Sequence, residues 1–240
     1  MITTSKVQPT QNQRGFTYLL PPIGEQFVHF ASTCEHSVVD IGAAYGVATL
    51  PALEAGARVI AVDISEQHLV ALKQRAARYQ SSLRIIPGRF PFLYDRCLEG
   101  IGAAYLSQVL PFLTPDQVML GANRLYNWLV PGGKVFIVSF TPFLNHVHRF
   151  LDVYHERKAQ GKRFAGYIDT LAQYCSDKTI GDQLPESILH VDEDDLRSAF
   201  SEAGFAIEHL SLFGDVHNDL PEGIRYDGRE RVGMIASKPN

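Results

Sequence analysis

The 240-residue sequence predicts an α/β fold with a doubly wound, mostly parallel sheet. Three observations lead to this prediction. Short apolar runs rich in β-branched residues alternate with helical patterns from residue 37 to residue 141. These runs are apolar on both faces, which is typical of parallel strands covered by helices on both sides. A turn with two glycines joins the first run to a helix, as in the first half of a nucleotide-binding βαβ unit.

The composition is that of an ordinary globular protein and narrows the range of partners. Hydrophobic residues make up 45% of the chain, and the formal net charge of −4 gives no electrostatic reason to expect nucleic acid. No apolar run approaches the ~20 residues of a membrane span, and the polar N-terminus lacks a secretory signal. Three widely spaced cysteines fit neither a disulfide framework nor a metal site. We therefore expect a cytoplasmic protein without a metal, a membrane partner or a nucleic-acid partner.

Local start and stop signals set most boundaries in the first 141 residues. Ser65 is a suitable N-cap for a helix that runs to about residue 79. Thr114 and Gln117 form a capping-box pattern, with Pro115 at the first helical position. The predicted helices are 23–34, 47–54, 66–79 and 115–129, and the predicted strands are 37–41, 57–64, 83–86, 101–108 and 134–140.

The alternation of strands and helices breaks after residue 141. Helix-like pieces follow at 145–160 and 167–174, with no strand between them. This stretch is long for a crossover, so we interpret residues 142–190 as a cap over the ligand edge of the sheet.

The core resumes with a helix from Asp192 as N-cap to residue 203, which Gly204 ends. Strands 206–213 and 231–238 are joined by residues with little helical pattern, so we expect them to pair antiparallel. The expected units are an N-terminal tail and helix (1–34), a core (35–141), the cap (142–190) and the C-terminal part of the core (191–240).

The glycine turn indicates which kind of nucleotide binds there. Its residues are Gly42, Ala43, Ala44, Tyr45 and Gly46. The dinucleotide fingerprint G-x-G-x-x-G has a glycine where this turn has Ala44, and that glycine allows close approach of a pyrophosphate. Asp40, just before the turn, would repel a pyrophosphate and suits a cationic group. The turn therefore favours a nucleoside without phosphates.

Asp63 ends the second strand, where such folds hold a ribose. A carboxylate accepts hydrogen bonds from both ribose hydroxyls. The alternative is a solvated aspartate that caps the following helix. Ribose binding is favoured because Asp63 and the glycine turn indicate the same ligand independently.

Several motifs together resemble the class I S-adenosylmethionine (SAM)-dependent methyltransferases. They are Asp40-x-Gly42-x-x-x-Gly46, Asp63 at the end of the second strand, Val109–Leu113 after the fourth strand, Pro131-Gly132-Gly133 and the final strand pair. The resemblance covers roughly residues 35–140 and 190–238. It implies a three-layer Rossmann-like core with a seven-stranded sheet, mostly parallel with the last strand antiparallel. It also implies SAM as cofactor and S-adenosylhomocysteine (SAH) as product.

The resemblance assigns expected roles position by position. The turn passes under the methionine part of SAM, Asp63 holds the ribose and Ile64 packs on the adenine. Gly88, Arg89 and Phe90 frame the adenine edge. Arg89 stands where the family often has an aspartate that accepts from the adenine amine, and arginine has no acceptor. Ser107 and Gln108, at the end of the fourth strand, face the methionine end or the transferred methyl.

The sequence says least about the acceptor and about the residues that would bind it. His146 and His148 in the cap, and Tyr18 before the first helix, are the candidate catalytic residues, with surface or packing roles as the alternative. A small molecule is the expected acceptor, and a protein acceptor stays open. The other functional hypotheses are an NAD-dependent oxidoreductase and a non-catalytic SAM- or SAH-binding module that acts on a protein partner.

Overall fold

A computed structural model describes residues 8–9, 16–17, 19–93, 98–176, 185–216 and 220–240. Its centre is a seven-stranded sheet with the strand order β10-β11-β7-β6-β3-β4-β5. The strands are β3 (Val38–Ile41), β4 (Val59–Asp63), β5 (Leu83–Pro87), β6 (Ile101–Ser107), β7 (Leu129–Phe140), β10 (Ala206–Phe213) and β11 (Arg231–Ser237). Strand β11 runs antiparallel to both of its neighbours, while the pairs from β7 to β5 are parallel. The predicted fold, including the antiparallel last strand, is confirmed.

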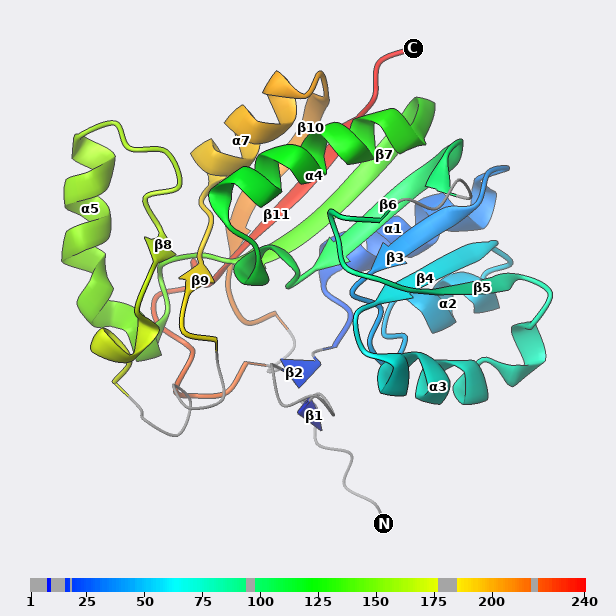
Figure 1. Cartoon of the computed structure of the whole chain (residues 1–240), viewed down its shortest axis with the longest axis horizontal. Helices are drawn as coiled ribbons and strands as arrows, with labels where there is room; N and C mark the ends of the chain where they lie inside the picture. Colours follow the sequence, from blue (N-terminus) through cyan, green and yellow to red (C-terminus); the bar gives the residue numbers. More distant parts are fainter. Residues whose placement is uncertain (1–7, 10–15, 18, 94–97, 177–184, 217–219) are drawn as a thin grey trace.

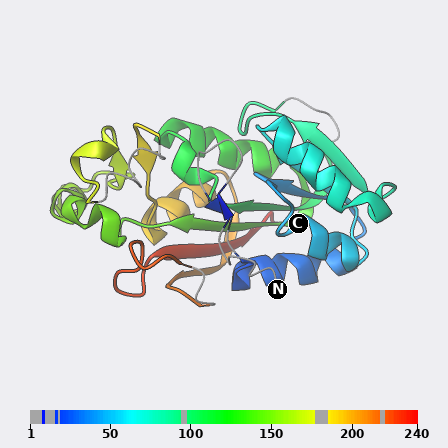
Figure 2. The same cartoon turned by 90° about the horizontal axis from the view of Figure 1, so that it is seen from below.

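Helices cover both faces of this sheet, as the apolar runs predicted (Figures 1 and 2). The helices are α1 (Pro22–Thr33), α2 (Thr49–Glu54), α3 (Glu66–Arg75), α4 (Pro115–Trp128) and α7 (Glu193–Glu202). One core cluster packs α4 and α7 against the sheet, and a second packs α1 and α2 against its opposite face. Both faces of the central parallel strands β3, β4 and β6 are therefore buried, as is typical of parallel strands covered by helices on both sides.

Side-chain caps fix the helix starts where the sequence predicted them. Ser65 accepts from the His68 amide at 3.4 Å, and Thr114 forms a full capping box with Gln117. Asp192 caps α7 in the same way, and Gly204 follows that helix with φ +103°. These caps depend on residues three positions apart, so the sequence alone locates them.

The cap region differs from the prediction in one element. The helical segment expected at 167–174 is wrong. In its place β8 (Tyr167–Ile168) pairs antiparallel with β9 (Ile188–Leu189), followed by the short 3₁₀ turn η5 (Leu171–Gln173). The pairing gives hydrogen-bond partners to backbone N–H and C=O groups. In an isolated helix of this length, most such groups at the two ends would have no partner within the helix. The helical piece predicted at 145–160 is present as η4 (Asn145–Phe150) and α5 (Leu151–Ala159).

Residues 142–190 follow directly after β7, and the cap role expected for them stays a prediction. Strand β7 ends at Phe140, and the chain continues directly into the cap, which lies to one side of the sheet in Figure 1. The amide of Val191 donates to the carbonyl of Phe140 at 3.2 Å, so the segment after β9 is fixed to the end of β7. Within the described ranges, no helix has the length and apolar character needed to cross a membrane.

Candidate functional site

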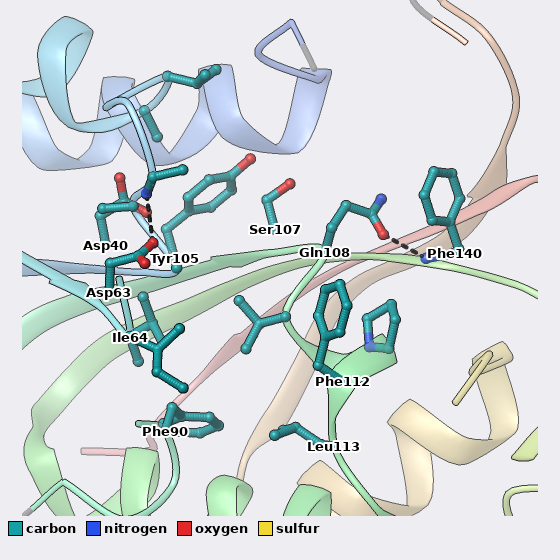
Figure 3. A pocket seen from close by; sticks show the side chains of 18 of the residues that line it. Asp40, Asp63, Ile64, Phe90, Tyr105, Ser107, Gln108, Phe112, Leu113 and Phe140 are labelled. Carbon is teal, nitrogen blue, oxygen red and sulfur yellow. Dashed lines mark hydrogen bonds between the residues drawn. The ribbon is translucent and has the colours of Figure 1, made fainter. Parts of the chain in front are cut away.

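A cavity of about 290 Å³ opens at the carboxyl ends of the parallel strands and extends to the cap. Figure 3 shows Asp40 and Asp63 at one end of it and Phe140 at the other, with Phe112 and Leu113 along one side. Ligands of open α/β sheets bind at this edge, because strand order reverses there and the loops diverge. Here the reversal lies between β3 and β6, which carry the chain to opposite halves of the sheet.

The glycine turn contributes three predicted site residues to the cavity, and Asp40 before the turn is a fourth. Asp40, Gly42, Ala43 and Ala44 line it, whereas Tyr45 and Gly46 do not. Gly42 and Ala44 have φ of +76° and +42°, and a Cβ at Gly42 would lie 2.7 Å from the Val109 side chain. Gly42 is required there because a side chain would be both strained and too close.

Gly46 has a packing role behind the turn. Its φ is +86°, and a Cβ at this position would lie 2.4 Å from Leu72 of α3. The two predicted glycines therefore differ: Gly42 forms cavity wall, and Gly46 allows the turn to pack against α3.

Asp63 is a buried, highly bonded carboxylate. Its Oδ2 accepts from the amide of Ala44 at 2.9 Å, and its Oδ1 accepts from the amide of Ser65 at 2.8 Å. His68 Nδ1 lies 3.2 Å from Oδ1. A carboxylate offers about four lone-pair directions, so roughly one remains at Oδ2 for a ligand. Asp63 is only 6% exposed and therefore not solvated, but its bonds to Ser65 and His68 lie at the start of α3, as the capping alternative expects. The ribose role stays a prediction.

Asp40 is an energetically costly anion at the same end of the cavity. The carboxyl is 3% exposed, and its Oδ2 accepts from the Thr49 hydroxyl at 2.6 Å. Burial, reinforced by the nearby charge of Asp63 and opposed by the Thr49 hydrogen bond, raises the pKa of Asp40 to about 6. A buried carboxylate with a raised pKa attracts a cationic ligand, because such a ligand offsets the lost hydration. Sequence reasoning missed Thr49, which lies nine residues after Asp40 at the start of α2 and belongs to no motif.

The predicted adenine-side residues surround the open rim of the cavity. Ile64, Gly88, Arg89 and Phe90 all line it. Ile64 is 57% exposed and free to cover a flat ring, while Phe90 is buried with its ring centroid 6.2 Å from that of Trp128. Arg89 is exposed at the rim.

Ser107 and Gln108 both line the middle of the cavity, as Figure 3 shows. Gln108 adopts a φ of +56°, and its Oε1 accepts from the Phe140 amide at 3.0 Å. This bond ties the end of β6 to the end of β7. Tyr105 also lines the cavity, and burial raises the pKa of its hydroxyl well above its usual value. Tyr105 was not predicted, because a tyrosine within an apolar strand reads as a core residue.

The three predicted catalytic residues differ in where they lie relative to the cavity. His146 is 4% exposed and lines the cap side of the cavity, whereas His148 is exposed, with its Nδ1 2.6 Å from the Asn145 carbonyl. Tyr18 lies outside the described residues. His190, which was not predicted, lines the cavity beside His146. No sequence pattern marks His190 as a cavity residue, because its neighbours in the structure come from distant segments of the chain.

His190 is buried and held neutral. Its side chain is 1% exposed, and its Nδ1 has no hydrogen-bond partner among the described residues. Burial, with a smaller contribution from nearby His146, lowers the pKa of His190 to about 3. The ring is therefore an uncharged imidazole at neutral pH, with one donor and one acceptor nitrogen. The described residues include no group of three or more metal-ligating side chains.

Comparison with known proteins is consistent with this geometry. A family model described as "Methyltransferase domain" matches residues 38–133. The chain is 29% identical over 160 residues to a carboxy-S-adenosyl-L-methionine synthase of Shewanella amazonensis, covering 65% of this chain and 64% of that one. It is 31% identical over 120 residues to a synthase of the same name from Psychromonas ingrahamii, covering 46% and 48%. The matches thus span less than two thirds of each curated relative.

Solved structures share the whole fold at low sequence identity. A SAM-dependent methyltransferase from Methanosarcina mazei superposes with a TM-score of 0.64 at 15% identity, covering 92% of this chain and 99% of that one. The CcbJ methyltransferase from Streptomyces caelestis has a TM-score of 0.63 at 14% identity, covering 92% and 91%. Three observations indicate the same kind of domain, a methyltransferase domain. They are the strand order, the order of the motifs from Asp40 to Gly133 and the matched family model. Residues 38–133 thus match the methyltransferase domain model, and the chain has the fold of class I SAM-dependent methyltransferases.

Proposed function

We propose that the chain binds SAM in this cavity and transfers its methyl group to a small-molecule acceptor that enters beside the cap. The observation that carries the proposal is the pair of buried carboxylates, Asp40 and Asp63, at the ends of adjacent strands β3 and β4. Asp40 favours a cationic ligand, and Asp63 keeps one acceptor position beside the turn. A phosphate-free nucleoside with a positive charge fits both features.

The residues have complementary roles in this proposal. Bound SAM supplies a methyl group already activated by its sulfonium. Asp40 binds the cationic part, Asp63 accepts from a ribose hydroxyl, and Ile64 with Phe90 encloses the adenine. Gln108 fixes the ends of β6 and β7, so the walls on either side of the reacting centre keep their spacing. Orientation of this kind contributes on the order of 7–11 kcal/mol to such displacements.

The cavity itself favours a small acceptor. Its volume of about 290 Å³ lies near the lower end of the range for small-molecule pockets. Residues 142–190 form one wall through Leu144 and Ile188, which is the role proposed for this region as a cap. The comparisons give no support to the NAD-dependent oxidoreductase or to the non-catalytic module.

A second candidate reaction follows from the names of the curated relatives, which are carboxy-SAM synthases. Such a product carries an added carboxylate, which needs a cationic partner when it is buried. Near the cap the described cavity lining has only His146 and His190 as titratable groups, and His190 is held neutral. Methyl transfer to an acceptor is therefore the reaction that the site supports better.

Calorimetry with SAM, SAH and NAD tests the cofactor. We expect sub-millimolar binding of SAM and SAH and none of NAD. Absence of SAM and SAH binding would refute the proposal. Mass spectrometry of the cofactor products after incubation with candidate acceptors separates the two reactions, since SAH indicates methyl transfer and a carboxylated SAM indicates the second.

A further inference from the structure

On the basis of the proposed function, we propose that the acceptor carries a neutral carbonyl oxygen and that Gln108 binds this oxygen through its side-chain Nε2. Gln108 thus determines which acceptors fit, in addition to joining the ends of β6 and β7. Four features lead to this inference. They are the fixed orientation of the Gln108 amide, its unbonded nitrogen, its place along the cavity and the charges of the cavity lining.

Two hydrogen bonds fix the orientation of the Gln108 side-chain amide. The backbone amide of Gln108 donates to the Val138 carbonyl at 2.8 Å, and the side-chain Oε1 accepts from the Phe140 amide at 3.0 Å. Because a backbone N–H is always a donor, the side-chain atom that faces it is Oε1 and not Nε2. The amide group is planar, so fixing Oε1 also fixes the direction of the two N–H bonds on Nε2.

Nε2 is the polar atom of the Gln108 side chain that is left for a ligand. It carries two N–H donors, and neither has a protein acceptor within the described residues. The hydrogen bond that Oε1 accepts polarises the amide and makes these donors stronger. The backbone of Gln108 adopts a φ of +56°, which is uncommon for a residue other than glycine and occurs preferentially at functional sites. A fixed, unbonded donor on such a backbone indicates a binding role.

Gln108 lies in the half of the cavity that the proposed cofactor leaves for the acceptor. It lines the cavity, and Figure 3 shows it between Ser107 and Phe140. Asp40 and Asp63, the two groups proposed to bind the cofactor, lie at the other end. Phe140 is the last residue of β7, after which the chain enters the cap. Of the two places expected for Gln108, beside the methionine end or beside the transferred methyl, this position favours the second.

The lining of this half of the cavity offers no fixed positive charge to an anionic acceptor. Phe112, Leu144 and Ile188 give it apolar walls, and the His190 imidazole is held neutral by burial. Among the described lining residues, the lysines and arginines are represented only by Arg89, on the proposed adenine side. A carboxylate or phosphate would therefore lose its hydration here without an opposite charge beside it, at a large cost in free energy. A ketone or amide on an apolar group needs only a donor and apolar contacts, and this half of the cavity has both.

Nuclear magnetic resonance of the wild-type protein saturated with SAH is the first test. The side-chain amide signals of Gln108 are identified by their absence from the spectrum of Gln108→Glu. The probes are acetophenone, α-methylstyrene, which has the same shape with a CH₂ group in place of the carbonyl oxygen, and benzoate, which carries a charged carboxylate. We expect acetophenone to move the Gln108 amide protons downfield in a saturable way, as a new hydrogen bond does, and α-methylstyrene to cause no such shift.

Benzoate is expected to bind at least about tenfold more weakly than acetophenone, because its charge is not matched in this half of the cavity. The inference is overturned by the absence of an acetophenone shift at millimolar concentration, by the same shift with α-methylstyrene, or by benzoate binding as tightly as acetophenone. Failure of SAH itself to bind is a different outcome, which refutes the proposed function.

Gln108→Glu then tests the donor separately from the bond to β7. The variant keeps an oxygen for the Phe140 amide and replaces the NH₂ donor by a second oxygen. We expect the ratio of the acetophenone and α-methylstyrene dissociation constants to rise by about tenfold, which is typical of a lost hydrogen bond that leaves an acceptor unpaired, with the SAH dissociation constant within about twofold of wild type. Comparing this ratio between proteins cancels the difference in hydrophobicity between the two probes.

Gln26→Glu is the matched control, because Gln26 is exposed on α1 and lies outside the cavity lining. The same ratio in Gln108→Glu and Gln26→Glu overturns the role of Gln108. Loss of SAH binding in Gln108→Glu alone also overturns it, because the amide would then serve the cofactor or the fold and not the acceptor.

Discussion

Asp40 offers the sharpest test of how the cavity is built, because its expected effects on stability and on binding have opposite signs. The carboxyl is buried, and burial raises its pKa from 3.8 to about 6. Above pH 6 the folded protein carries this anion at a cost that the unfolded chain does not have. A shift of about two units corresponds to about 3 kcal/mol, at about 1.4 kcal/mol for each unit.

Asp40→Asn removes this cost while keeping the shape of the side chain. Its amide oxygen still accepts from the Thr49 hydroxyl, and we allow about 1 kcal/mol for the weaker bond to a neutral acceptor. We therefore expect the free energy of unfolding at pH 7 to rise by about 2 kcal/mol. A raised folded-state pKa stabilises the wild type fully below pH 3.8, and this contribution is lost as the pH rises through 6. The advantage of the variant should thus vanish between pH 6 and pH 4.

Urea denaturation at pH 7, 5 and 4 measures this effect, with Asp169→Asn as control because Asp169 is an exposed aspartate in a cap loop. On the proposed function, the same Asp40→Asn variant should bind SAM at least about tenfold more weakly, since it loses a charge-assisted contact. Equal stability of wild type and Asp40→Asn at pH 7, or a difference that does not change with pH, would refute the reasoning about the buried charge.

Three further predictions concern the neighbouring elements. On the proposed function, Asp63→Ala should weaken SAM binding by about 2–3 kcal/mol in calorimetry, because it would remove the expected ribose contact and the Ala44 bond that fixes the turn; unchanged affinity would remove Asp63 from the ribose site. Gly46→Ala should lower the free energy of unfolding by at least about 2 kcal/mol more than Gly56→Ala in urea denaturation, because both glycines have positive φ but only Gly46 lacks space for a Cβ. Tyr154→Phe should cost about 1.5–3 kcal/mol of stability, because its hydroxyl donates to buried Asp192 at 2.7 Å; a thermal midpoint equal to that of wild type would contradict this.

The parts of the fold that the sequence predicted depend on short-range chemistry. Thr114 and Asp192 cap their helices through bonds to residues three positions away, so a local pattern is enough to find them. Asp63 was located by the rule that parallel strands bring their carboxyl ends to one edge, and it does line the cavity there. Its ligand stays a prediction, because the bonds observed at Asp63 come from its own chain.

The parts that the sequence did not predict depend on contacts between distant segments. Tyr167 lies in a segment with helical spacing, yet it pairs with Leu189, 22 positions along the chain. That pairing also places His190 at the end of β7, beside Phe140, 50 positions earlier. No local signal distinguishes His190 from any other histidine. Sequence reasoning therefore selected His146 and His148, of which only His146 lines the cavity.

The two ends of the cavity have different electrostatic character. Asp40 and Asp63 are buried carboxyl groups at the β3 and β4 end, while burial keeps the His190 imidazole at the cap end neutral. On the proposed function, SAM carries one positive charge more than SAH into this cavity. Because a nearby positive charge offsets the lost hydration of the buried Asp40 carboxylate, the site should hold SAM more tightly than SAH.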